Sequence, residues 1–75
     1  MNGYLPTLNL SPQTEKLLIK KKIYYTFAYG GELRFYKHNQ LIWYASAEMD
    51  ELVKNGNECI DFFVKNGYIP NMETQ

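Results

Sequence analysis

The alternation of apolar and polar side chains is clearest between residues 22 and 45, where it predicts a three-stranded β-meander. The glycine pair at 30–31 is typical of the first tight turn, and Asn39 with Gln40 is expected to form the second. The expected strands are 22–29, 32–38 and 41–45. Since strands joined by tight turns pair antiparallel, we expect an antiparallel sheet.

The length of the first turn decides which side chains share a face of this sheet. A two-residue turn at the glycine pair would mix apolar and polar side chains on each face. A three-residue turn over 30–32 would instead pair Tyr29 with Leu33. It would also pair Phe27 with Phe35. We predict this longer turn, because it collects six apolar side chains on one face: Ile23, Tyr25, Phe27, Tyr29, Leu33 and Phe35.

The opposite face of the predicted sheet carries aromatic and cationic side chains. The third strand is apolar on both sides, so two alternatives stay open for its contribution. One adds Leu41 and Trp43 to this face, and the other adds Ile42 and Tyr44. We predict a partner-binding surface here, formed by Tyr24, Arg34, Tyr36, His38, Trp43 and Tyr44.

The N-terminal part is predicted to hold a loose arm and a short helix. Residues 1–10 lack periodicity and form the arm, whereas Ser11 is a good N-cap and Pro12 suits the first helical position. The helix is expected over about 12–21. The polar residues 70–75 are expected to form a frayed tail. Whether the N-terminal segment covers the second sheet face stays open.

Residues 46–66 have the pattern of a C-terminal helix or helix pair. Ser46 is a candidate N-cap, and Gly67 is the expected left-handed stop. The stretch around Gly56 indicates a break, with Asn57 capping a second helix. Because the apolar stripe stays in phase across Gly56, one long kinked helix is the alternative. The chain is therefore expected to be a single small α+β domain over residues 1–75.

Composition narrows the class of protein. The chain has one cysteine, Cys59, and one histidine, His38, so we expect neither an intrachain disulfide nor a zinc site. A free cysteine without a signal-peptide pattern is typical of a cytoplasmic protein, and no apolar run is long enough to span a membrane. A chain of 75 residues has a thin stability margin, which self-association would relieve.

The charges are unevenly distributed although the net charge is zero. Residues 1–38 hold six basic and two acidic side chains, and residues 39–75 hold two basic and six acidic ones. Our preferred interpretation is that the two halves attract each other within the fold. The alternative is a dipolar surface with a basic and an acidic face.

No spacing in the chain predicts catalysis. His38 lies beside a turn, Cys59 lies on an apolar helical stripe, and no glycine-rich phosphate loop is present. We therefore expect no enzymatic activity, no metal or other cofactor and no small-molecule substrate. Instead we expect a protein-binding module, with a second protein or a second copy as partner. Such modules are often accessory subunits, regulators or inhibitors, some of them encoded by phages and mobile elements.

Single-stranded nucleic acid is the alternative partner. Basic and aromatic side chains alternate along the first two strands, as they do on surfaces that stack bases and hold phosphates. The basic members are Lys20, Lys21, Lys22, Arg34, Lys37 and His38. The zero net charge argues against this alternative.

Overall fold

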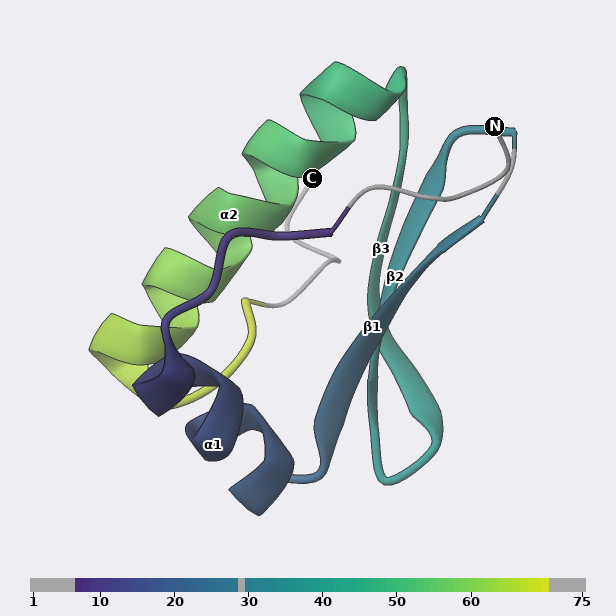
Figure 1. Cartoon of the computed structure of the whole chain (residues 1–75). Coiled ribbons are helices and arrows are strands. Elements are labelled where there is room, and N and C mark those ends of the chain that lie inside the picture. The colour runs from purple at the N-terminus through teal and green to yellow at the C-terminus, as the bar shows by residue number, and fades with distance from the viewer. Residues whose placement is uncertain (1–6, 29, 71–75) are drawn as a thin grey trace.

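A short helix, three strands and a long helix follow one another in the computed structural model, which describes residues 7–28 and 30–70. The elements are α1 (Pro12–Lys20), β1 (Ile23–Ala28), β2 (Glu32–Lys37), β3 (Gln40–Ser46) and α2 (Met49–Asn66). The strands form one antiparallel sheet in the order β1-β2-β3. Both helices lie on one side of the sheet (Figure 1). The predicted α+β fold class, a meander packed against a C-terminal helix with a short N-terminal helix, is confirmed.

The first hairpin has the predicted faces but different strand partners. Phe27 pairs with Leu33 rather than with Phe35, so the predicted register is wrong by two residues. Because a shift of two residues keeps every side chain on its own face, the predicted apolar face is nevertheless correct. Its buried members are Ile23, Phe27, Leu33 and Phe35. Tyr29, also predicted for this face, lies outside the described residues.

The position of the glycine pair explains the difference in register. Both glycines have positive φ, +95° and +87°, a backbone conformation that other residues rarely adopt. The N–H of Gly31 donates to the carbonyl of Ala28 at 3.3 Å, and its carbonyl accepts from the N–H of Ala47 at 3.0 Å. Ala28 therefore already pairs with Glu32, and Glu32 begins β2 instead of closing the turn.

The second turn comes one residue earlier than predicted. His38 and Asn39 form it, with φ of 51° and 65°, and Gln40 already belongs to β3. Positive φ at both central residues is typical of the two-residue hairpin turn whose twist matches that of the flanking strands. His38 is therefore an exposed turn residue and not the last residue of a strand.

A β-bulge in β3 decides which of its side chains face the helices. Tyr36 pairs with Leu41, whereas Phe35 pairs with Trp43, so Ile42 is the extra residue. Trp43 consequently shares the buried face of Phe35. One predicted alternative placed Leu41 and Trp43 on the face away from the helices, and the other placed Ile42 and Tyr44 there. Because of the bulge, this face holds Leu41 from the first alternative and Tyr44 from the second.

The core lies between β2 and α2. Its fully buried large side chains are Leu33, Phe35, Leu52 and Phe63. The helix approaches the sheet at Gly56, where a Cβ would lie 2.8 Å from Cδ2 of Leu33 and 2.7 Å from Cδ2 of Leu8. Gly56 is therefore a close-packing position inside one continuous helix, and the predicted break is wrong. Ser46 ends β3 instead of capping the helix, whose N-cap is Glu48.

The described part of the N-terminal arm packs on the helix side of the sheet. Leu8 is buried, and its N–H donates to the hydroxyl of Tyr25 at 3.0 Å. Ser11 caps α1 as predicted by accepting from the N–H of Thr14 at 3.1 Å, and Pro12 is the first helical residue. Residues 1–6 and 71–75, which hold the rest of the predicted arm and tail, lie outside the described residues.

We predict that Gly31→Ala lowers the free energy of unfolding more than Gly30→Ala. Both variants place a side chain at positive φ, which costs about 1–2 kcal/mol. At Gly31 the new Cβ also lies 2.5 Å from the backbone oxygen of Ala47, whereas at Gly30 it meets nothing within 4 Å. Overpacking of this kind adds about 1–3 kcal/mol. Urea denaturation measures the difference, and equal losses in the two variants would contradict the packing described for this turn.

Candidate functional site

The sheet face that points away from the helices is the candidate site, and we call it the outer face. Strand pairing arranges its side chains in cross-strand rows. The rows are Tyr24-Tyr36-Leu41, Thr26-Arg34-Tyr44 and Ala28-Glu32-Ser46. Tyr24, Leu41 and Tyr44 are each 45% exposed, which is high for large apolar or aromatic side chains. The outer face is therefore an aromatic surface with one central cation.

Two tyrosine rings are stacked at one end of the outer face. The ring centroids of Tyr24 and Tyr36 are 5.1 Å apart, and the ring planes differ by 17°. The hydroxyl of Tyr24 donates to Oδ1 of Asn39 at 3.2 Å, so the second turn holds the stack in place. Cross-strand aromatic pairs contribute about 0.5–1.5 kcal/mol beyond the area that they bury. The stack therefore presents a pre-ordered aromatic surface.

Arg34 lies at the centre of the outer face. It forms an ion pair with Glu32, two residues earlier on the same strand, and the side chains of Arg34 and Glu32 are 42% and 30% exposed. The pKa of Arg34 is raised by its contact with the Tyr36 hydroxyl and by Glu32, so the guanidinium stays charged. Exposed ion pairs contribute little to stability, because water screens the two charges. The pair restricts the guanidinium, which lies beside Tyr44 in its own row and next to the row of the tyrosine stack.

Four of the six predicted site residues lie together on the outer face: Tyr24, Arg34, Tyr36 and Tyr44. His38 lies at the end of the sheet, in the exposed second turn. Trp43 lies on the opposite face, where its ring meets the edge of Phe35 at a centroid distance of 5.3 Å. Leu41 lies on the outer face instead of Trp43. The sequence predicted Leu41 there only as one of two alternatives, because no residue pattern in this strand indicates the bulge.

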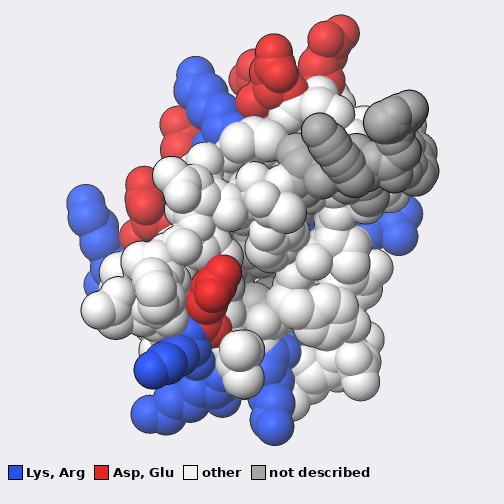
Figure 2. Space-filling model, in the orientation of Figure 1, with Lys and Arg blue, Asp and Glu red and all other residues white. Residues whose placement is uncertain are grey.

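Charges are separated along the length of the molecule. Figure 2 shows Lys and Arg side chains gathered at the end where α1 meets β1, and Asp and Glu side chains at the end where α2 begins. Exposed basic-end residues are Lys20, Lys21, Lys22, Lys37 and His38, and exposed acidic-end residues are Glu48, Asp50 and Glu51. Within residues 7–28 and 30–70, the single ion pair joins Arg34 to Glu32, so no ion pair joins the basic end to the acidic end. This arrangement favours the dipolar interpretation of the charge pattern.

The titratable groups that could act in catalysis lie apart. Cys59 is buried, and burial raises the pKa of its thiol to about 12, so the nucleophilic thiolate is disfavoured. His38 lies in the exposed second turn. Within the described ranges, no three His, Cys, Asp or Glu side chains come together as metal ligands would.

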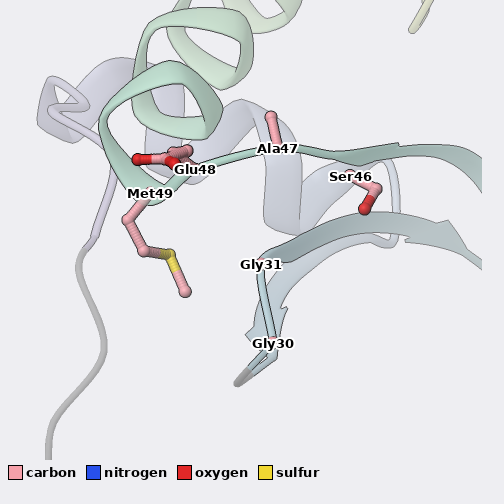
Figure 3. Close-up of a pocket in the computed structure, with 6 residues that line it drawn as sticks. All are labelled: Gly30, Gly31, Ser46, Ala47, Glu48 and Met49. Atoms are coloured by element: carbon pink, nitrogen blue, oxygen red, sulfur yellow. The ribbon is translucent and has the colours of Figure 1, made fainter.

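A shallow hollow lies between the first turn and the start of α2 (Figure 3). Its lining residues are Gly30, Gly31, Ser46, Ala47, Glu48 and Met49. Among the described lining residues, Glu48 has the one acidic or basic side chain, so these residues bring together no acid–base pair. The outer face consequently remains the best candidate for function.

Neither helix in the described part of the chain combines the length and the apolar content needed to cross a bilayer. No protein-family model, curated protein or solved structure matches the chain. Inference about function therefore rests on the composition and geometry of the outer face.

Proposed function

We propose that this chain is a non-enzymatic protein-binding module that uses the outer face to hold its partner. It would act as an accessory subunit, regulator or inhibitor of that partner. A cytoplasmic location fits the single free thiol, because free cysteines persist in reducing compartments. The observation that carries the proposal is the exposed tyrosine stack beside Arg34 on a sheet face that neither described helix covers.

The outer face has the composition of an interface centre. Tyrosine and arginine contribute much of the binding energy in protein interfaces, because they combine large apolar area with a polar or charged end. The stack and the ion pair already restrict the side chains of Tyr24, Tyr36 and Arg34, so less side-chain entropy is lost on binding. Both properties favour a protein partner.

The charges around the outer face indicate the chemistry of that partner. Lys22, Lys37 and His38 lie at the end of the sheet next to the tyrosine stack, and all three are exposed. A partner with an apolar centre and carboxylates on one side would match both the rings and these cations. We therefore propose an acidic-rimmed protein surface as the partner.

Single-stranded nucleic acid is the second candidate, and the same basic end favours it. Lysines beside a stacked tyrosine pair are the combination that holds phosphates and stacks bases. Labelled oligonucleotides titrated at low salt test this function, with Lys22→Glu as the variant that should weaken binding. Absence of binding at micromolar protein, or equal binding by Lys22→Glu, would remove this candidate.

We predict that Tyr24→Glu weakens partner binding while Tyr68→Glu leaves it intact. Tyr24 is 45% exposed on the outer face, whereas Tyr68 is 57% exposed after the end of α2. The two variants make the same chemical change on different surfaces. Affinity capture from the source cells, followed by calorimetric titration with the purified partner, gives the dissociation constant of each variant. Loss of an interface aromatic weakens binding by about tenfold or more.

Circular dichroism before the titration ensures that both variants are folded. Equal dissociation constants for Tyr24→Glu and the unmodified chain would show that the partner binds elsewhere. Capture of no partner that binds the purified chain would contradict the proposed function itself.

A further inference from the structure

The outer edge of β3 is a strand edge without charge. The sheet order β1-β2-β3 leaves β3 paired only on its β2 side within the described residues. From Gln40 to Ala47 the chain contains no charged residue and no proline. Natural proteins usually protect an edge strand with lysine, proline, an inward-pointing charge or a β-bulge, because its unpaired N–H and C=O groups otherwise bind another strand. The bulge at Ile42 interrupts only the first part of β3, and the strand beyond it has none of these features.

Hydrogen-bond alternation identifies the backbone groups that point outward. The N–H of Ala47 donates to Gly31 of the neighbouring turn, so at this position the strand faces inward. Backbone groups along an antiparallel strand alternate between the two sides. The N–H groups of Tyr44 and Ser46 therefore point to the outer edge, beyond the bulge at Ile42.

The other edge strand, β1, is also free of charge and proline from Ile23 to Ala28, but lysines stand at its start. β1 directly follows the exposed residues Lys20, Lys21 and Lys22. Lysines next to an edge strand discourage pairing, because a second strand would have to approach their charges. β3 is preceded by His38 and Asn39 and followed by Ala47. The nearest lysine in sequence, Lys37, lies on β2 opposite Gln40 and so stands on the inner side of β3.

Charge complementarity indicates which molecule pairs with β3. The strand starts at the basic end of the molecule, next to Lys37 and His38, and ends at the acidic end, next to Glu48. A second copy of the chain that pairs antiparallel with β3 brings its acidic end beside the basic end of the first copy. The opposite contact forms at the other end of the strand. The zero net charge leaves no overall repulsion between the copies.

We propose that a second copy of this chain pairs antiparallel with the outer edge of β3, around a two-fold axis near Ala45 that sets Tyr44 opposite Ser46 of the second copy, to form a continuous six-stranded sheet. All four helices then lie on one side, and the two outer faces join into one aromatic surface. Backbone pairing supplies the contact, so this dimer does not depend on what the outer face binds. It also removes the exposed edge of a small sheet.

The first test follows amide exchange by NMR at low and high protein concentration, with sedimentation reporting the oligomeric state. In the monomer the amides of Tyr44 and Ser46 should exchange quickly. In the dimer their exchange should slow by about tenfold or more, while the inward amide of Ala45 is protected at both concentrations. This pattern reports edge pairing directly and needs no substitution.

Three results would overturn the proposal. The chain could stay monomeric up to about 1 mM, which would mean that the dissociation constant of the dimer is too high for a specific dimer. It could dimerise without added protection of Tyr44 and Ser46. These amides could also be protected equally at all concentrations, which would mean that the chain covers its own edge.

A charge reversal tests the antiparallel orientation. Lys37→Glu puts a negative charge where the acidic end of the second copy should lie, whereas Lys54→Glu makes the same charge change on the exposed surface of α2. We expect Lys37→Glu to weaken dimerisation about three- to tenfold more than Lys54→Glu. Equal effects of the two variants would contradict the orientation.

The face variant separates this dimer from the proposed function. Tyr24 lies on β1, at the far edge of the sheet from β3. Tyr24→Glu should therefore dimerise like the unmodified chain even if it no longer binds the partner protein. Loss of dimerisation in Tyr24→Glu would mean that the copies meet through their outer faces, which overturns edge pairing.

Discussion

The contact between Gly56 of α2 and Leu33 of β2 is the constraint on which the rest of the structure depends. The missing side chain lets the helix approach until a Cβ would lie 2.8 Å from Leu33, and it also makes room for Leu8. Leu33 and Phe35 are fully buried under α2 as a result. A small chain has too few residues to build a second core, so the helical layer covers only one sheet face.

The properties of the outer face follow from this single-sided packing. Side chains that alternate with Leu33 and Phe35 along β2 point the other way, and these are Glu32, Arg34 and Tyr36. Pairing then sets Tyr24 beside Tyr36 and Tyr44 beside Arg34. The orientation of these side chains is thus a direct consequence of the core. Folding does not require them to be aromatic, whereas a binding function does.

The fold and the division of the sheet into two faces could be predicted from the sequence, because strands leave a two-residue period and helices leave capping residues and an apolar stripe. Strand partners could not, since a shift of two residues leaves the pattern unchanged and only the turn geometry at Gly31 decides between registers. Trp43 was misplaced because a bulge inserts one residue without altering composition. Gly56 resembled a helix break because sequence does not distinguish close packing from a stop.

Solvent access to individual rings tests most directly whether the outer face is open while the other face forms the core. A soluble gadolinium chelate accelerates the relaxation of ring protons that solvent can reach, and the experiment is done on the dilute, isolated chain. We expect strong acceleration for Tyr24 and Tyr44 and almost none for Phe35 and Phe63, which are fully buried. Equal protection of Tyr24, Tyr44 and Phe35 would contradict it, because the outer face would then be covered within the molecule itself.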